Sequence, residues 1–294
     1  MRYQIRHARV QFGGDVILRD VNFEVHDREK IAIVGRNGCG KTTLLKLIAG
    51  DIEMSNPDSD EECGITMAGG QEIGFLRQVN FVDAEVTVED ELKKVFAPVF
   101  ACEERMKELE EQMKTAAETK GTAPDGALLR EYDRLQKQME AMRGYSWRRD
   151  METMFQRFGF ALEDLRRPIG SFSGGQQTKV AFIKLLLTRP DIMLLDEPTK
   201  GLDAYAKQNL AQLLRKLAAE GAAILIVTHD VEFAAQYATR CALMFDGTLL
   251  SGDEPHAFFA GNRFYTTDAN RIASNYLPQA ITCEEVIAAC KDSL

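Results

Sequence analysis

The residues best suited to chemistry lie in a glycine-rich segment at positions 35–42, which reads Gly-Arg-Asn-Gly-Cys-Gly-Lys-Thr. This order matches the phosphate-binding pattern G-x-x-x-x-G-K-[ST]. Glycines let the backbone curl so that several N–H groups point at phosphate oxygens, and a helix that begins near Lys41 adds the positive end of its dipole. We expect Lys41 to neutralise the β- and γ-phosphates and Thr42 to bind Mg²⁺. The predicted nucleotide-binding residues are Gly35, Asn37, Gly38, Cys39, Gly40, Lys41, Thr42 and Thr43.

Two neighbouring acids, Asp196 and Glu197, follow the apolar pair Leu194-Leu195. A carboxylate at the end of a buried strand can hold Mg²⁺ through water, and we assign this role to Asp196. Glu197 comes directly after it, where a carboxylate can polarise an attacking water. Two ordinary acids at a strand end are the alternative, which the phosphate-binding segment disfavours.

A third segment, Ser173-Gly174-Gly175-Gln176, precedes an apolar helical stretch from Val180 to Leu187. A serine and two glycines at a helix start form another shape that binds anions. Taken alone, the same letters are often only a turn and a helix cap. The segment gains weight because it lies 23 residues before Asp196 in a chain that already has a phosphate-binding pattern.

The elements that must position these residues alternate between strands and helices. Residues 3–26 alternate apolar and polar side chains around Gly13-Gly14, which predicts two strands and a turn. Continuous apolar runs predict strands that are buried on both faces, and helices between them make the core a parallel α/β sheet. A final hairpin is expected around an Asp-Gly turn. The buried runs are 31–34, 192–195 and 223–227, and the hairpin strands are 241–245 and 248–250.

The middle of the chain has a different pattern. Apolar residues recur at helical spacing on both sides of a Gly/Pro-containing stretch, residues 121–126, which predicts an antiparallel coiled-coil hairpin over residues 103–143. We favour a projecting hairpin over a helical subdomain that packs flat, because the apolar seam is narrow and charges are dense. The seam residues are Met106, Leu109, Met113, Ala116, Leu128, Tyr132, Leu135, Met139 and Met142.

Composition restricts the function class. The 294 residues carry a net charge of −9 with a pI of about 5.2, so nucleic-acid contact needs a local basic patch. The first residues lack the apolar region of a secretory signal, and no apolar run reaches the roughly 18 residues that span a bilayer. We therefore expect a cytoplasmic protein. If it drives transport, another polypeptide supplies the membrane part.

Together these segments resemble the ATP-binding cassette (ABC) superfamily over about residues 1–250. The resemblance implies ATP and Mg²⁺ as ligands and a head-to-tail dimer of cassettes, homodimer or heterodimer, in which the Ser-Gly-Gly-Gln signature of one subunit caps the γ-phosphate held by the other. It further implies roles for four residues: Gln78 near Mg²⁺ and the attacking water, Asp203 in the D-loop, His229 as the switch histidine, and Phe12 stacked on adenine.

The resemblance also implies a fold. It is an α/β P-loop NTPase with an ABC-type antiparallel β subdomain and a helical subdomain that carries an α-hairpin arm. We expect one ABC ATPase domain over residues 1–294, with the helical subdomain at 79–170 and a C-terminal tail at 251–294.

Two branches of the superfamily are represented. Residues 1–199 resemble the first cassette of ABC-F proteins, the soluble group that acts on ribosomes, through the Val34–Gly38 stretch, residues 73–78 and the hairpin. Residues 200–294 resemble the ATPases of energy-coupling-factor importers, through Lys-Gly-Leu-Asp at 200–203 and the stretch 258–267. We therefore hypothesise a mosaic, natural or constructed, with a crossover near residues 194–199.

Two functions follow as hypotheses. The first is an ABC-F-like factor that couples ATP binding to the ribosome, to rRNA or to tRNA. The second is a transporter ATPase that is docked, as a membrane-peripheral subunit, on a transmembrane partner. The hairpin does not decide between them, because residues 103–143 hold ten acids and eight bases. A basic stretch allows two interpretations, contact with RNA or a helix with a packed tryptophan. It contains Arg143, Arg148 and Arg149, with Tyr145 and Trp147 between them.

Overall fold

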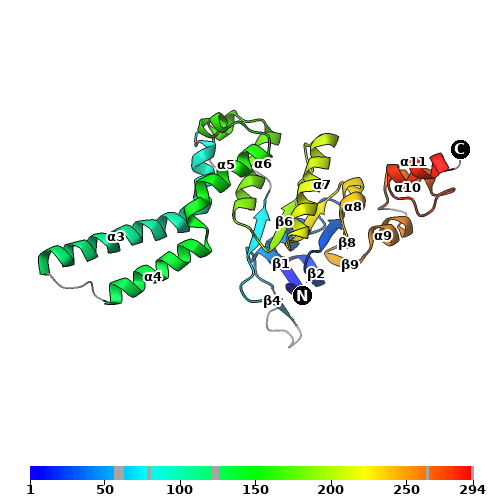
Figure 1. Cartoon of the computed structure of the whole chain (residues 1–294). Helices are drawn as coiled ribbons and strands as arrows, with labels where there is room; N and C mark the ends of the chain where they lie inside the picture. Colours follow the sequence, from blue (N-terminus) through cyan, green and yellow to red (C-terminus); the bar gives the residue numbers. More distant parts are fainter. Residues whose placement is uncertain (56–62, 78–80, 82, 121–125, 263–264, 293–294) are drawn as a thin grey trace. The chain divides into compact units, whose positions relative to one another are not determined.

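The chain divides into two compact units, which are described separately. In the computed structural model (Figure 1), the first unit comprises Met1–Gln78 and Arg189–Leu294, and the second comprises Val79–Thr188. The structure describes residues 1–55, 63–77, 81, 83–120, 126–262 and 265–292. None of the helices in these ranges is long and apolar enough to cross a membrane.

A six-stranded sheet forms the centre of the first unit, in the order β5-β6-β7-β3-β8-β9. All neighbouring pairs are parallel except β8 with β9. The three predicted central strands are confirmed, and their apolar runs are buried because helices cover both faces of a parallel sheet. The strands are β3 (Lys30–Val34), β5 (Ile73–Leu76), β6 (Ile192–Asp196), β7 (Ala223–Thr228), β8 (Arg240–Phe245) and β9 (Thr248–Asp253).

A second, antiparallel sheet contains the N-terminal hairpin. It has the order β2-β1-β4 and is built from β1 (Tyr3–Phe12), β2 (Asp15–Val25) and β4 (Gly64–Met67). The predicted turn at Gly13-Gly14 is confirmed, and both glycines have positive φ. Alternate residues such as Val21 and Phe23 of β2 enter the core that also contains Leu44 and Leu45, so this sheet packs over the helix that follows the phosphate-binding segment.

The helices of the first unit include three that were expected only as a tail. The C-terminal residues fold back onto the sheet, because Phe258, Phe259 and Ile281 are buried in one cluster with Ala32 and Val34 of β3. The expected start of the tail at residue 251 is also corrected, since β9 continues to Asp253. The helices are α1 (Lys41–Ala49), α7 (Ala204–Ala219), α8 (Val231–Tyr237), α9 (Pro255–Gly261), α10 (Asp268–Ala273) and α11 (Cys283–Asp292).

The second unit is helical. It extends to Thr188, beyond the expected end at residue 170, because Val180 and Ile183 of its last helix belong to the same buried cluster as Phe155 and Phe172. Its elements are α2 (Val88–Lys93), η1 (Lys94–Phe96), α3 (Ala97–Lys120), α4 (Gly126–Ala141), η2 (Gly144–Ser146), α5 (Trp147–Arg157), η3 (Leu162–Arg166), η4 (Ile169–Ser171) and α6 (Gly174–Leu187).

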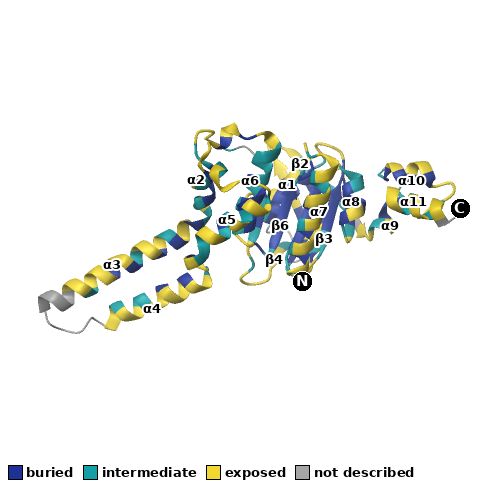
Figure 2. Cartoon of the chain, turned by 45° about the horizontal axis from the view of Figure 1, so that its top comes forward, coloured by how far each residue is buried: buried dark blue, intermediate teal, exposed yellow. Residues whose placement is uncertain are grey.

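The predicted hairpin corresponds to α3 and α4, which lie side by side and extend away from α2, α5 and α6 of their own unit (Figures 1 and 2). Leu109, Leu135 and Met139 of the seam are buried between the two helices, and Arg105 Nε donates to Glu131 at 2.9 Å. The first helix begins at Ala97, earlier than the expected residue 103, because it continues directly from η1. The predicted turn falls largely on residues 121–125, outside the described residues.

Candidate active site

The phosphate-binding segment lies between β3 and α1, as predicted. Gly40 is the N-cap of α1 with φ 105° and makes no side-chain cap hydrogen bond, so this helix end has no capping side chain that would compete with a bound anion. Gly35 is required for a different reason, because a Cβ there would lie 2.4 Å from the backbone oxygen of Met244 on β8. The loop is therefore shaped by close backbone packing against a neighbouring strand.

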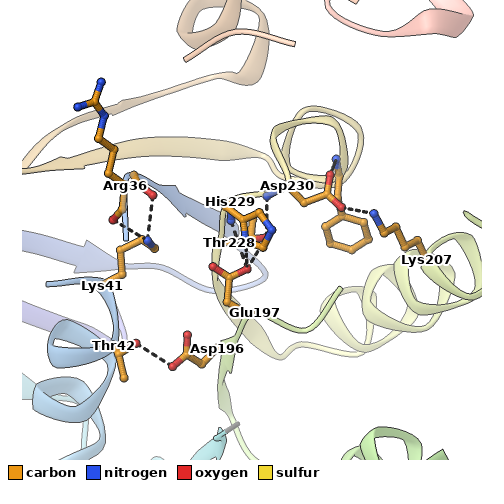
Figure 3. A network of polar contacts seen from close by, with 11 residues as sticks. Arg36, Lys41, Thr42, Asp196, Glu197, Lys207, Thr228, His229 and Asp230 are labelled. Carbon is orange, nitrogen blue, oxygen red and sulfur yellow. Dashed lines mark hydrogen bonds and ion pairs between the residues drawn. The ribbon is translucent and has the colours of Figure 1, made fainter. Parts of the chain in front are cut away.

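Lys41 is only 7% exposed, and its ammonium group lies inside the curl of the loop. Its Nζ donates to the backbone oxygens of Gly35 at 2.9 Å and Arg36 at 3.0 Å (Figure 3). These carbonyls hold a buried cation in the position from which it can reach a phosphate bound by the loop. The remaining predicted loop residues differ in exposure: Asn37, Gly38 and Thr42 are exposed, and Cys39 and Thr43 are partly buried.

Thr42 and Asp196 form the candidate Mg²⁺ site. Thr42 Oγ1 donates to Asp196 Oδ2 at 2.9 Å, which brings together two oxygen donors of the kind that Mg²⁺ prefers. Burial raises the pKa of Asp196; the Thr42 hydrogen bond opposes this shift and the nearby charge of Glu197 adds to it. No cluster of three or more His, Cys, Asp or Glu side chains suited to a metal occurs in the described ranges. The pair fits a metal whose other ligands are phosphate oxygens and water.

Glu197 lies just beyond β6 in a left-handed backbone conformation, with φ 50°. This conformation is uncommon outside glycine and is typically held by the surrounding structure. The Glu197 backbone N–H donates to the Val227 oxygen at 2.9 Å. Its Oε2 accepts from His229 Nδ1 at 2.7 Å, from Thr228 Oγ1 at 3.2 Å and from the His229 N–H at 3.3 Å (Figure 3). The printed contacts of the carboxylate are thus all made by one oxygen, Oε2.

Two further predicted residues of the first unit have clear positions. Phe12 ends β1 and the residue is 52% exposed, which is compatible with the expected stacking on a base. Asp203 is the N-cap of α7, and its Oδ1 accepts from the Ala206 N–H at 2.7 Å. Gln78 lies outside the described residues.

The signature serine belongs to the second unit, where it caps α6. Ser173 Oγ accepts from the Gln176 N–H at 3.3 Å, while Gln176 Oε1 accepts from the Ser173 N–H at 2.9 Å. This reciprocal pair is a capping box. Gly174 and Gly175 form the first turn, and a Cβ added at either of them would meet no atom within 4 Å, so this helix end has room for a ligand. The same residues can therefore cap the helix and still leave space for an anion at its N-terminus.

The structure adds residues that the sequence did not single out. Asp230 follows His229 and caps α8, and its Oδ2 accepts from Lys207 Nζ of α7 at 2.6 Å. Thr228 precedes His229 and accepts from the Asp230 N–H at 3.0 Å. Thr228 and Asp230 could have been found from the sequence, because they are the polar neighbours of His229. No local sequence signal pointed to Lys207.

Comparisons with known proteins agree with this geometry. The family model described as "ABC transporter" matches residues 18–200. A solved "Structure of ATP binding subunit of ABC transporter" has a TM-score of 0.64 and 20% identity, covering 98% of this chain and 99% of that one. A nucleotide-free ATP-binding cassette from an ABC transporter has a TM-score of 0.63 and 18% identity, and the match covers 90% of this chain and 96% of that one. At these identities, the structural likeness shows the fold.

Relatives share more sequence. A protein of Bacillus thuringiensis subsp. konkukian, named "Putative ABC transporter ATP-binding protein", is 34% identical over 98% of this chain and 46% of its own length. ABC transporter F family member 5 of Arabidopsis thaliana is 34% identical over 81% of this chain and 33% of its own length. Energy-dependent translational throttle protein EttA of Mycobacterium tuberculosis is 33% identical over 79% of this chain and 38% of its own length.

The chain spans about half the length, or less, of these relatives. The Bacillus alignment covers 292 residues, and so lies on both sides of residue 199. A splice between two families is therefore not needed to account for the change in sequence character near that residue. Cassettes of this kind bind ATP with Mg²⁺ and work as dimers. On the matched family model, the relatives and the shared fold, the chain belongs to the ABC transporter family of ATP-binding cassette ATPases.

Proposed function

We propose that this chain hydrolyses MgATP to ADP and phosphate as one half of a head-to-tail pair of cassettes, and that it acts as an ABC-F-like, ribosome-associated factor in the cytoplasm. The observation that supports hydrolysis most directly is the grouping around the end of β6. There Asp196 contacts Thr42 of the phosphate loop, and the next residue, Glu197, contacts His229. A metal-binding pair and a base-histidine pair thus come from consecutive residues.

Each side chain has a separate task in this proposal. Thr42 and Asp196 would hold Mg²⁺, which supplies charge neutralisation for the phosphates. Lys41 shifts its ammonium group from the loop carbonyls to the β- and γ-phosphates. Glu197 orients the attacking water through Oε1 and accepts its proton, while His229 holds Oε2 and contacts the γ-phosphate. Gln78 is proposed to contact Mg²⁺ and the water.

The second cassette completes the site. The capped end of α6, with Ser173, Gly174, Gly175 and Gln176, is proposed to cover the γ-phosphate held by the partner cassette. Asp203 would lie at the same interface. The partner is a second copy of this chain or a different cassette, because one cassette contributes only half of each site.

The hairpin supports the ribosomal role over transport. Arg130, Arg134 and Lys137 occur at i, i+4 and i+7 on α4 and are all exposed, so they line one face of the helix, which they share with the exposed acid Asp133 at i+3. None of the three forms an ion pair within the described part of the chain, in contrast to Arg105 of α3. With three cations and one acid, this face has a net positive charge, which suits the phosphate backbone of rRNA or tRNA.

The residues of the basic stretch at the base of the hairpin differ in their contacts. Trp147 packs against Phe96 and Phe100, with ring centroids 5.6 and 5.0 Å apart, so it belongs to the core. Arg148 is paired with Glu152 at 3.1 Å. Tyr145 is exposed, and it is therefore the aromatic ring of this stretch that is free to contact a partner.

A second candidate function is the ATP-binding subunit of an energy-coupling-factor type importer. It is favoured by the name of the Bacillus relative, which refers to an ABC transporter. In this case a separate transmembrane subunit would bind the chain and place it at the membrane surface. The names of the EttA and F family relatives favour the ribosomal role instead.

Co-sedimentation with ribosomes tests the proposal. Glu197→Gln removes the carboxylate that accepts the proton, so this variant should retain ATP and form a stable ATP-dependent dimer. We expect it to pellet with ribosomes in ATP and to remain in the supernatant in ADP. Replacing Arg130, Arg134 and Lys137 by alanine should reduce pelleting without loss of the ATP-dependent dimer. If neither pelleting nor dimerisation occurs, the ribosomal proposal is wrong.

A further inference from the structure

We propose that Lys207 and Asp230 form a positioning pair that fixes the switch histidine His229 relative to the start of α7. Lys207 Nζ donates to Asp230 Oδ2 at 2.6 Å, and the two side chains are 35% and 14% exposed (Figure 3). The inference rests on the proposed function of His229 and goes beyond it, because neither partner of the pair touches the nucleotide in that proposal.

The Asp230 carboxylate accepts several hydrogen bonds in addition to the one from Lys207. Its Oδ1 accepts from the Phe233 N–H at 3.0 Å, which caps α8. Its carboxylate also takes a hydrogen bond from Thr199, which is 3% exposed and follows Glu197 by two residues. Burial alone would raise the pKa of Asp230, but these hydrogen bonds and Lys207 keep it below its ordinary value. The carboxylate is thus an ionised, fully engaged anchor.

The anchor is connected directly to the catalytic pair. The Asp230 N–H donates to Thr228 Oγ1 at 3.0 Å, and that hydroxyl donates to Glu197 Oε2 at 3.2 Å. His229 lies between Thr228 and Asp230 in the chain, so both of its neighbours are held by side-chain hydrogen bonds. A shift of Asp230 must therefore move the backbone of His229 or break these bonds.

Lys207 connects the same anchor to α7. The Lys207 N–H donates to the Asp203 oxygen at 2.9 Å, so it lies one helical turn after the Asp203 cap. Asp203 is the residue proposed to lie at the cassette interface. The pair therefore joins the interface end of α7 to the histidine loop, and a contact made at Asp203 has a short, rigid route to His229.

Removal of the link should misplace His229 without unfolding the unit. Catalytic groups lose efficiency steeply with small displacements, and a shift of about 1 Å can cost about 10²-fold in rate. We expect Lys207→Met to lower kcat by about 10- to 100-fold while the KM for ATP changes little. Lys207→Arg retains the charge and should restore part of kcat.

The histidine can also be observed without hydrolysis. The chain has four histidines, so ¹³C labelling of the imidazole Cε1 gives few NMR signals, and His229→Gln assigns the one of interest. In the nucleotide-free full chain, Lys207→Met should shift or broaden the His229 signal. Asp230→Asn should do the same, because it removes the ionic pair and keeps an oxygen that can cap α8. Lys216→Met is the matched control, since Lys216 is an exposed lysine of the same helix with only a 3.9 Å contact to Glu220.

The outcomes separate the pair from the proposed function. A His229 signal that moves in Lys207→Met and Asp230→Asn but not in Lys216→Met, with the expected loss of kcat, supports the positioning pair. An unmoved signal, an equal change in Lys216→Met, or an unchanged kcat overturns it. If the unsubstituted chain hydrolyses no ATP, the proposed function fails, while the His229 signal still decides whether the pair positions the histidine.

Discussion

His229 and Glu197 are joined at 2.7 Å between Nδ1 and Oε2, although they follow different strands, β7 and β6. These strands are parallel neighbours, so their carboxyl ends meet at one edge of the sheet. The left-handed turn at Glu197 directs the carboxylate toward the histidine loop. Oε2 accepts from three donors, which leaves Oε1 for the attacking water in the proposed mechanism.

The first prediction concerns this pair. His229→Ala should lower the rate of phosphate release by about 10²- to 10⁴-fold, and the double variant with Glu197→Gln should be little worse than Glu197→Gln alone, because the two residues act as a unit. His256→Ala is the control, since His256 makes a similar 2.7 Å contact with Glu285 in the C-terminal region. Additive losses in the double variant would contradict a shared role.

The second prediction tests the close packing of the phosphate loop. Gly35→Ala places a Cβ 2.4 Å from the Met244 oxygen and 2.9 Å from Cys39 Sγ, so the loop or β8 must shift. We expect a loss of about 1–3 kcal/mol in the free energy of unfolding and a much weaker binding of ATP. Gly69→Ala meets no atom within 4 Å and serves as the control. Urea unfolding and fluorescent-ATP titration measure both effects, and equal behaviour of the two variants would disprove the argument.

The third prediction concerns the exposed ring of Phe12. If it stacks on adenine, Phe12→Ala should raise the KM for ATP by an amount equivalent to about 1–3 kcal/mol, with little change in kcat, and Phe12→Trp should preserve binding. Tyr276→Ala removes an even more exposed ring and should leave both constants unchanged. A fall in kcat at constant KM would assign Phe12 a different role.

Features carried by contiguous residues could be predicted from the sequence. The strand, loop and helix around Lys41 follow one another in the chain, and the hairpin seam repeats at helical spacing, so local patterns were sufficient. The start of α3 was missed because the apolar residues Val99 and Cys102 continue the seam without a break or a cap that marks its boundary.

Links between distant residues could not be predicted. Lys207 and Asp230 are 23 residues apart, and Lys184 and Glu91 are 93 apart. In a chain with 28% charged residues, sequence alone does not show which lysine meets which acid. The burial of Phe258 and Phe259 against β3 likewise depends on how the C-terminal helices fold back over the sheet.

The fourth prediction concerns a buried ion pair that joins two helices of the second unit. Glu91 of α2 is 8% exposed and accepts from Lys184 of α6 and from Lys94. Burial alone would raise the pKa of Glu91, but the hydrogen bonds from Lys184 and Lys94 outweigh it, so the folded pKa lies below the ordinary value. The pair therefore stabilises the fold when the carboxylate is ionised.

This lowered pKa sets the direction of the pH dependence. A carboxyl whose pKa falls on folding contributes its full stabilisation above the unfolded pKa of about 4.3 and loses it as the pH drops through the folded value. In urea unfolding, wild type should exceed Glu91→Gln in stability near neutral pH, and this difference should vanish on acidification.

Lys184→Met should lower the free energy of unfolding by about 1–3 kcal/mol at neutral pH because it removes a partner of a buried carboxylate. Lys107→Met should cost less, since its partner Glu103 is exposed. A difference between wild type and Glu91→Gln that grows with acid would show that Glu91 is held in its neutral form instead.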